Sequence, residues 1–379
     1  FAQGNTNASM LGKVSEKTGV LPGATVVAVH TPSGSKYGTS TDNNGYFKIS
    51  NMRVGGPYKV TISYVGYKTE EIGNVFLQLG DSQNVTVVLT EDTSALSEVV
   101  VTGGKDNVFN SKKTGAQTII DSKKINSLPS LSRNISDFAR LTPQAQIRND
   151  DQISISGQNN RYNAIYIDGA VNNDVFGLAD NGTNGGQTGV SPISLDAIEQ
   201  FQVQVAPFDV KISGFAGGAI SAITRSGTND FEGSAYFLGR NQDIAGKTPP
   251  SLVAAGSSRE KLSDFTAYTA GIRAGGAIIK DKLFYFINYE RQDNETPQPF
   301  DSNLYTGTAR NFSYGQFNPS NPSQPIQITF NSTNATMNHL SEVLSSRGYN
   351  LGAFTDKVSK LVSDKLIAKI DYNINDNHK

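Results

Sequence analysis

The side chains that most often carry out covalent chemistry or bind metals are scarce in this sequence. Its 379 residues include no cysteine, and its only histidines lie far apart, at His30, His339 and His378. Zinc sites and Ser-His-Asp triads need several such groups at characteristic spacings. Acidic pairs such as Asp150-Asp151 are poor acid–base pairs, because adjacent residues on a strand point to opposite faces. The sequence therefore predicts no catalytic residues, no metal site and no enzymatic activity.

The sequence also lacks the features that bind nucleic acids or nucleotides. Its 33 Lys and Arg residues balance 34 Asp and Glu residues, whereas phosphate backbones are bound by clustered positive charge. The glycines at 214, 217 and 218 do not form a G-x-G-x-x-G pattern, and no G-x-x-x-x-G-K-[ST] pattern occurs. We therefore expect no nucleic-acid partner and no cofactor.

One short β-branched segment is suited to binding through its backbone. It consists of Leu96, Ser97, Glu98, Val99, Val100, Val101, Thr102 and Gly103. An extended peptide of this kind can add as a strand to the edge of a partner's sheet, where main-chain hydrogen bonds supply the affinity. The alternative is that the segment is the last strand of the domain that precedes it.

A second segment, residues 172–189, is rich in glycine and carries side chains that could bind a ligand. These are Asn172, Asn173, Asp174, Asp180 and Asn181. Such a loop could hold calcium or contact a substrate. The alternative is a plain flexible surface loop without a ligand.

These segments belong to a chain that is rich in turns and strands. It has 37 glycines and no apolar run of 18 residues, so no transmembrane helix is predicted. Residues 8–91 contain short strands at regular spacing, a pattern typical of a β-sandwich. Within them, Asp42 to Gly45 predicts a hairpin turn rather than a calcium loop, because the later acidic ligands are missing. Residues 92–115 are predicted to be a linker.

Residues 116–226 combine short helices and strands. Helices are expected at 122–126 and at 135–141, where the second ends before Pro143. Strands are expected at 116–120, 153–156, 164–167, 201–205 and 217–224. This pattern predicts an α+β domain.

From residue 229 onwards, apolar and polar residues alternate. In 283–290, for example, Leu283, Tyr285, Ile287 and Tyr289 share a face opposite Asn288 and Glu290, and 230–240, 267–274 and 365–375 alternate similarly. Strands with one apolar and one polar face, joined by long, short and long connections, are typical of a transmembrane β-barrel. Apolar residues in the last long connection predict two helices, one ending near Gly348 and one over 354–362.

Four such strands cannot close a barrel, because the sheet would keep two unpaired edges. Large plugged barrels have about 22 strands. We therefore expect the chain to be the N-terminal part of a longer polypeptide. Because it opens on Phe1 instead of Met, we also expect an export signal that has been cleaved.

Several motifs resemble those of a known receptor family. Residues 12–14, 21–26, 41–47 and 64–67 resemble the carboxypeptidase-regulatory-like domain, a transthyretin-like sandwich. Residues 96–103 resemble the TonB box of outer-membrane receptors, and 117–121, 165–170, 193–201 and 214–228 resemble the plug domain of TonB-dependent receptors. Usual members carry Arg-Gly-Pro and Tyr-Gly where this chain has residues 205–207 and 213–215. The departure favours the SusC-like and Oar-like branch over siderophore receptors.

The resemblance implies a multidomain protein in the outer membrane of a Gram-negative bacterium. A periplasmic sandwich (8–91), a linker with the TonB box (92–115) and a plug domain (116–226) would precede the first four strands of a transmembrane antiparallel β-barrel (229–379). TonB and outer-membrane lipid are the implied partners, and a surface lipoprotein is compatible with the family.

The implied function is import of a peptide, a glycan or another large nutrient by displacement of the plug. The implied substrate contacts lie in the apical plug loop, at Asn172, Asn173, Asp174, Asp180 and Asn181. The alternative is a receptor-shaped scaffold in a larger outer-membrane secretion or barrel-assembly complex, because one fold can host several functions.

Overall fold

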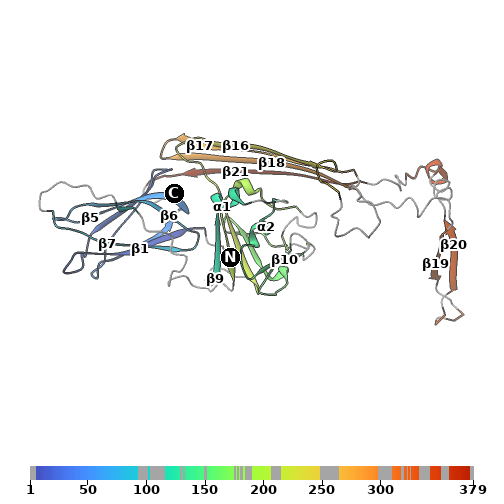
Figure 1. Ribbon diagram of the computed structural model, residues 1–379, viewed down its shortest axis with the longest axis horizontal. Helices are drawn as coiled ribbons and strands as arrows, with labels where there is room; N and C mark the ends of the chain where they lie inside the picture. Colours follow the sequence, from blue (N-terminus) through green and yellow to red (C-terminus); the bar gives the residue numbers. More distant parts are fainter. Residues whose placement is uncertain are drawn as a thin grey trace. The chain divides into compact units, whose positions relative to one another are not determined.

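The computed structural model describes most of the chain. The described residues are 6–92, 101–102, 116–128, 130, 133–148, 152–174, 176, 179, 182–183, 190–205, 215–247, 264–297, 310–316, 320–321, 323–324, 326–332, 342–350 and 358–375. The chain forms two compact units, one with residues 1–236, 270–291 and 363–379 and the other with residues 237–269 and 292–362. Figure 1 labels their helices and strands.

The N-terminal part of the first unit is a β-sandwich (Figure 1, blue). One sheet has the order β4-β1-β7, from β1 (Ala8–Ser15), β4 (Tyr46–Met52) and β7 (Ser82–Val88). The other has the order β3-β2-β5-β6-β8, from β2 (Thr25–His30), β3 (Ser35–Ser40), β5 (Gly55–Ser63), β6 (Glu70–Leu77) and β8 (Val101–Thr102). Alternate side chains of both sheets fill one core, in which Met10, Val26, Tyr58 and Ile62 are fully buried. The expected all-β sandwich is confirmed.

The turn between β3 and β4 is closed by its own side chain. The Asp42 carboxylate accepts hydrogen bonds from the backbone N–H groups of Asn44 and Tyr46, at 2.9 and 2.8 Å. Gly45 follows with a φ of 74°, a left-handed backbone conformation that glycine adopts without steric cost. Asp42 is therefore used by a turn. The predicted hairpin is wrong, because β3 and β4 lie in different sheets of the sandwich and the turn joins one sheet to the other.

The plug segment is built on a mixed sheet with two short helices. Its order is β13-β12-β15-β14-β9, from β9 (Ala116–Asp121), β12 (Ala164–Ile167), β13 (Ala170–Val171), β14 (Ile198–Val205) and β15 (Gly218–Thr224). The helices are α1 (Ser122–Ser127) and α2 (Ile135–Ala139), and a hairpin is formed by β10 (Ala145–Arg148) and β11 (Gln152–Ile155). Phe138 of α2 packs edge-on against Phe201 of β14, with ring centroids 6.2 Å apart. The expected α+β fold is confirmed.

On the face of this sheet opposite Phe201, strands β9 and β14 carry glutamine side chains. The buried Gln202 donates from Nε2 to Oε1 of Gln117 at 2.7 Å, while its own Oε1 has no hydrogen-bond partner. Gln200 accepts a hydrogen bond from the backbone N–H of Leu79 in the sandwich, also at 2.7 Å. One face of the plug sheet is therefore apolar and packs on helices, whereas the opposite face combines these amides with a small hydrophobic cluster of Ala164, Tyr166 and Ala219.

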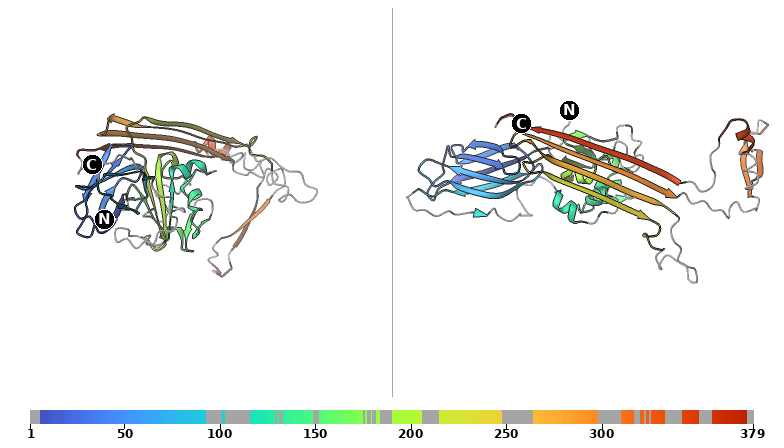
Figure 2. Two further views of the ribbon diagram at one scale, coloured as in Figure 1. Left: turned by 60° about the vertical axis from the view of Figure 1, so that its left-hand side comes forward. Right: turned by 90° about the horizontal axis from the view of Figure 1, so that it is seen from above.

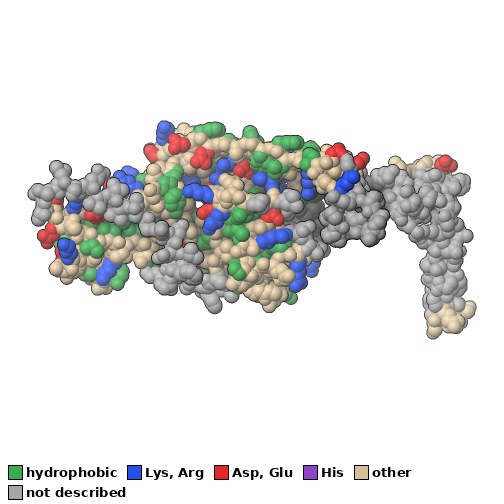
Figure 3. All heavy atoms as spheres, in the orientation of Figure 1, with side chains coloured by type: hydrophobic (Ala, Val, Ile, Leu, Met, Phe, Trp, Pro, Cys, Tyr) green, Lys and Arg blue, Asp and Glu red, His purple; other side chains and the backbone are tan. Residues whose placement is uncertain are grey.

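Four long strands form a separate sheet, in which they run side by side (Figure 2). The order is β16-β17-β18-β21, from β16 (Glu232–Asn241), β17 (Thr266–Ile279), β18 (Leu283–Pro297) and β21 (Val358–Tyr372). In β18, Asn288 and Glu290 are 0% and 4% exposed, whereas Ile287 and Tyr289 are 47% and 38% exposed. The predicted alternation is therefore confirmed, with Ile287 and Tyr289 on the outside, whereas Phe284 and Phe286 are buried on the inner face, at 1% and 3% exposed. Figure 3 shows hydrophobic side chains along these strands and both signs of charge intermingled over the visible surface.

The second unit contains one structure that the sequence pattern did not predict and one that it predicted wrongly. Strands β19 (Arg310–Gln316) and β20 (Ile326–Ser332) pair as an antiparallel hairpin that was not expected. The expected helix near Gly348 is present at 342–346. The helix expected over 354–362 is wrong from Val358 on, because β21 begins there and continues beside β18, and both strands have 15 residues. Residues 354–357 lie outside the described part of the chain.

None of the helices in the described ranges is long and apolar enough to cross a membrane.

Candidate functional site

The segment predicted to bind by strand addition is described only at its end. Val101 and Thr102 form β8, which pairs in parallel with Ile72 and Gly73 of β6. The predicted residues 96–100 and Gly103 lie outside the described residues. The described end of this segment is therefore the outermost strand of the larger sandwich sheet.

The predicted substrate loop is shaped by its own side chains. The Asn173 side chain accepts a hydrogen bond from the Ile165 N–H at 2.7 Å and donates one to the Asn163 carbonyl at 3.2 Å. The carboxylate of Asp174 accepts from the N–H groups of Phe176 and Ala179, at 3.1 and 2.5 Å. Both side chains therefore fix the course of the loop.

The other residues of this loop differ in their surroundings. The Asn172 side-chain nitrogen is buried without a hydrogen-bond partner, and Phe176 is 82% exposed. Asp180 and Asn181 lie outside the described residues. The structure thus brings Asn172, Asn173 and Asp174 together, and contact with a substrate stays a prediction for all five residues.

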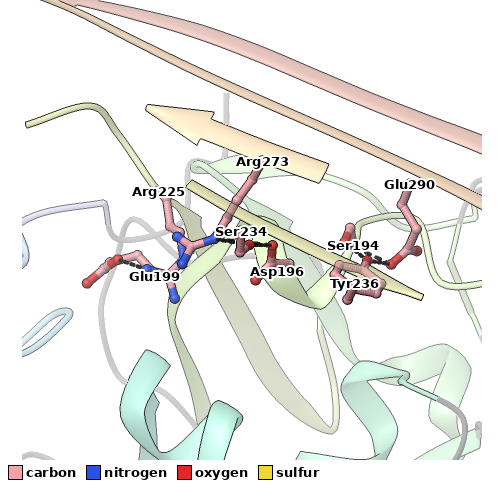
Figure 4. Close-up of polar contacts among 8 residues, drawn as sticks. All are labelled: Ser194, Asp196, Glu199, Arg225, Ser234, Tyr236, Arg273 and Glu290. Carbon is pink, nitrogen blue, oxygen red and sulfur yellow. Dashed lines mark hydrogen bonds and ion pairs between the residues drawn. The ribbon is translucent and has the colours of Figure 1, made fainter. Parts of the chain in front are cut away.

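Within the first unit, a set of polar contacts joins the plug segment to the inner face of the four-stranded sheet (Figure 4). Asp196, in the 3-10 helix η3 (Leu195–Ala197), forms an ion pair of 3.2 Å with Arg273 of β17. Ser234 of β16 donates to the Asp196 carboxylate at 2.6 Å and accepts from Arg273 Nε at 2.8 Å. The Arg273 and Asp196 side chains are only 15% and 11% exposed, so this group is largely shielded from water.

A second group surrounds Glu290 on β18. Its carboxylate accepts hydrogen bonds from Ser194 Oγ at 3.0 Å and from the Tyr236 hydroxyl, and it pairs with Lys365 Nζ at 2.8 Å. The Arg133 guanidinium lies over the Tyr236 ring, 4.4 Å from its centroid. The Glu290 carboxylate, on the inner face of the four-stranded sheet, therefore contacts β16, β21 and the plug segment at once.

A third group of polar contacts lies at the end of β15, where the chain leaves the plug sheet. Arg225 forms an ion pair of 3.4 Å with Glu199, and burial lowers the pKa of its guanidinium, against the opposing effect of Glu199. The adjoining Thr224 is fixed by Asp168, which accepts from its N–H at 2.8 Å and from its hydroxyl at 2.5 Å. Lys369 of β21 donates to the same hydroxyl at 3.4 Å.

The first two groups join the plug segment to the four-stranded sheet, whereas the third lies mainly within the plug segment. In the described part of the chain, no group of three or more His, Cys, Asp or Glu residues could hold a metal ion. In the sequence, Arg273, Glu290 and Lys365 lie on the polar faces of alternating strands. That alternation predicted that they would face inward from the four-stranded sheet. It did not identify Ser194 or Asp196 as their partners, because partners so distant in sequence are set by tertiary packing.

Three family models together match most of the chain. The carboxypeptidase regulatory-like domain matches residues 9–90, the TonB-dependent receptor plug domain matches 110–220 and the outer membrane beta barrel domain matches 223–379.

Individual proteins show the same similarity. The TonB-dependent transporter Oar of Myxococcus xanthus is 26% identical over a 306-residue alignment, and the match covers 76% of this chain and 27% of the relative. The chain therefore spans about a quarter of the length of the curated relative it matches. Among solved structures, the siderophore receptor PirA of Acinetobacter baumannii is 22% identical with a TM-score of 0.35, over 47% of this chain and 24% of that one. The outer membrane transporter YddB of Escherichia coli is 20% identical with a TM-score of 0.35, over 48% and 27%.

Proposed function

We propose that this chain, which carries the domains of the TonB-dependent receptors in order along its sequence, takes part in TonB-dependent import through the outer membrane of a Gram-negative bacterium. The observation that carries the proposal is the polar contact between the plug domain and the inner face of the four-stranded sheet. Asp196 pairs there with Arg273, and Ser194 donates to Glu290. These contacts hold a plug that has to be displaced before a large solute can pass.

The chemistry of the contact supports displacement. A hydrogen bond in which one group is charged, as in these contacts, can be exchanged for hydrogen bonds to water at a net cost of about 1.5–3 kcal/mol. The plug core around Phe138, Phe201 and Ile220 is apolar, so the same exposure to water would cost far more there. Phe286 of β18 also packs on this core and adds an apolar contact to the polar ones. A pull therefore separates plug from wall more easily than it unfolds the plug core.

The proposed source of the pull is TonB in the periplasm. The segment from Leu96 to Gly103 is the proposed TonB box, whose β-branched residues favour an extended backbone that can add to the TonB sheet. The sandwich and the plug domain lie on the periplasmic side in this proposal, and the protein reaches the membrane with a cleaved export signal. Outer-membrane lipid faces the exposed apolar residues of the wall, such as Leu366 and Ile370.

The proposed cargo is a peptide, a glycan or another large nutrient. The apical loop of the plug supplies Asn172, Asn173, Asp174, Asp180 and Asn181 for its recognition. The exposed ring of Phe176 supports a contact there, because an aromatic face can stack on a sugar or an apolar side chain. A surface lipoprotein is proposed as a further partner that delivers the cargo.

The test is deletion of residues 96–103 from the full-length protein in its own cells. Depletion of labelled peptide and oligosaccharide mixtures from the medium is measured against wild type and against a strain without the gene. We expect the deletion strain to match the strain without the gene while the protein still inserts into the outer membrane.

A second deletion of equal length, in residues 248–255 of a connection between strands, is the control. Depletion that is unchanged after loss of 96–103 contradicts coupling through this segment. It would favour the scaffold alternative, for which co-purification in fixed stoichiometry with secretion or barrel-assembly proteins is the direct measurement.

A further inference from the structure

The sandwich domain contacts the four-stranded sheet at the short turn, residues 280–282, that joins β17 to β18. The Pro32 carbonyl of the sandwich accepts a hydrogen bond from the Asn229 N–H at 2.7 Å. The Asn229 side chain in turn donates to the Asp281 carboxylate at 2.7 Å and accepts from the Asp281 N–H at 2.8 Å. All of these residues belong to the first unit. The loop between β2 and β3 is therefore linked to the 280–282 turn through Asn229.

A second link runs through Asn373, which directly follows β21. Its Nδ2 donates to Ser35 Oγ at 3.0 Å and to the Asp281 carbonyl at 2.9 Å, and its N–H donates to the Lys282 carbonyl at 2.8 Å. Ser35 is only 5% exposed, so this contact is shielded from water. A Cβ placed on the neighbouring Gly34 would lie 2.0 Å from Asp281 Oδ1. The sandwich therefore lies against the turn so closely that position 34 has no room for a side chain.

The same domain also contacts the plug sheet. Gln200 Oε1 of β14 accepts a hydrogen bond from the Leu79 N–H of the sandwich at 2.7 Å, and both residues are buried. Ile223 of β15 packs against the sandwich core. Lys123 Nζ of α1 lies 5.4 Å from the centroid of the Phe76 ring, an exposed cation–π contact worth about 0.5–1 kcal/mol. The sandwich therefore contacts the plug and the four-stranded sheet at once.

The contact with the 280–282 turn is the stronger of the two. Besides the hydrogen bonds described above, Arg53 Nη2 of the sandwich donates to the Gly227 carbonyl at 3.5 Å, in the connection that leads to β16. Each hydrogen bond contributes about 0.5–1.5 kcal/mol, so several of them outweigh the one that joins Leu79 to Gln200. Under load, the plug sheet is therefore expected to separate from the sandwich before the sandwich separates from the turn.

We propose that the sandwich is a fixed seat for the plug. It stays on the 280–282 turn while the plug sheet leaves it at Gln200 and later returns to it. The inference rests on the proposed function, because it assigns a role in plug displacement to the sandwich. A pull on residues 96–103, which connect the two domains in the sequence, acts on both of them. Since the sandwich is held by the turn, the plug is the domain that moves.

The first test measures the docking itself in the full-length protein. Gly34→Ala should detach the sandwich from the turn, because the added Cβ collides with Asp281. Gly23→Ala is the matched control, because the two glycines have similar φ values of 64° and 78° but a Cβ on Gly23 meets no atom within 4 Å. Hydrogen exchange of the Asn229 amide, which donates to Pro32, is the readout. We expect Gly34→Ala to accelerate it at least about tenfold and Gly23→Ala to change it by less than about twofold.

The second test locks the sandwich on the turn with Ser35→Cys and Asn373→Cys. Their side chains are in contact in the wild type, and residues 1–379 contain no other cysteine. Depletion of labelled peptide and oligosaccharide mixtures by cells is measured with the oxidised and the reduced protein. We expect the disulfide to form under mild oxidation and import to continue at the rate of the reduced form. The control pair, Thr25→Cys with Ser40→Cys, bridges β2 and β3 within the sandwich and should also import equally in both states.

The outcomes separate the fixed seat from the proposed function. Equal exchange of the Asn229 amide in Gly34→Ala and Gly23→Ala, or no disulfide between positions 35 and 373, overturns the docking whatever import does. Import that is lost on oxidation of this pair and recovered on reduction shows that the sandwich has to leave the turn, which overturns the fixed seat and leaves the proposed function intact. If loss of 96–103 leaves depletion unchanged, the proposed function is wrong and the role of the seat falls with it.

Discussion

At the scale of single residues, two cations on the inner face of the sheet have different partners. Arg273 pairs with Asp196 of the plug, whereas Lys365 pairs with Glu290 of its own sheet. All four side chains are at most 15% exposed. Removing one partner from such a pair leaves an uncompensated charge away from water, which costs more than the pair itself contributes. The pair of Arg273 and Asp196 therefore joins the plug to the sheet, whereas the pair of Lys365 and Glu290 joins two strands of the sheet.

We expect Asp196→Ala to loosen the contact between plug and wall. The Arg273 guanidinium loses its carboxylate, and breaking a buried ion pair in this way costs about 3–5 kcal/mol. Hydrogen exchange of the backbone amides around residues 194–198 in the full-length protein measures the loss. Adding Arg273→Met should recover most of it, because no charge then remains unpaired.

The matched control is an exposed ion pair of the same kind. Lys59 and Glu71 lie 2.8 Å apart on the sandwich with side chains 54% and 52% exposed, so Lys59→Ala should cost about 0–1 kcal/mol. An effect of Asp196→Ala no larger than that of Lys59→Ala would contradict the role of burial.

At the scale of elements, the alternation of residue types determined which strand faces could be predicted. Ile287 and Tyr289 are exposed and Asn288 and Glu290 buried as the period of two required, since burial on one face leaves a local trace in sequence. The helix expected over 354–362 is wrong from Val358 on. A short apolar run fits either period, and here the residues pair as β21 beside β18.

Other parts of the structure leave no such local trace. The pairing of β8 with β6 and the contact of Ser194 with Glu290 join positions far apart along the chain. The hairpin of β19 and β20 lies in a connection where strands were not expected. The polar wall could therefore be predicted from the sequence, and the partners on the plug could not.

The centre of the smaller sandwich sheet gives a prediction for an element. Gly12 lies on β1 between β4 and β7, opposite Phe47 and Val85. A Cβ at this position would lie 1.7 Å from the Val85 carbonyl oxygen, which cannot move without breaking the sheet. We expect Gly12→Ala to destabilise the sandwich by about 1–3 kcal/mol, the usual cost of overpacking. Denaturant dependence of hydrogen exchange in residues 8–91 of the full-length protein measures it.

Gly38 on β3 is the control for this substitution. The nearest atom to a Cβ there is the Val26 carbonyl oxygen at 3.8 Å, an ordinary contact, so Gly38→Ala should change stability by less than about 0.5 kcal/mol. Equal effects at the two positions would show that backbone entropy, and not crowding, sets the cost.

At the scale of the whole molecule, the proposed import requires that the polar contacts which hold the plug also give way. The plug meets β16 through Ser234, β17 through Arg273 and β18 through Glu290, so three neighbouring strands share the attachment. Displacement has to break all of them, whereas loss of one contact alone leaves the plug on the wall. A covalent link at a single one of these points should therefore block displacement completely.

Asp196→Cys with Ser234→Cys places that link between plug and wall. Their side-chain oxygens lie 2.6 Å apart in the wild type, so the two cysteines start close together, and residues 1–379 contain no other cysteine. We expect the oxidised protein to insert normally and to lose depletion of labelled peptides and oligosaccharides, with recovery after reduction. Asp196→Cys alone and the pair Thr25→Cys with Ser40→Cys control for the lost ion pair and for oxidation. Import by the oxidised protein at the rate of its reduced form would mean that the plug keeps its contact with β16 while cargo passes, and displacement from this strand would then not be part of transport.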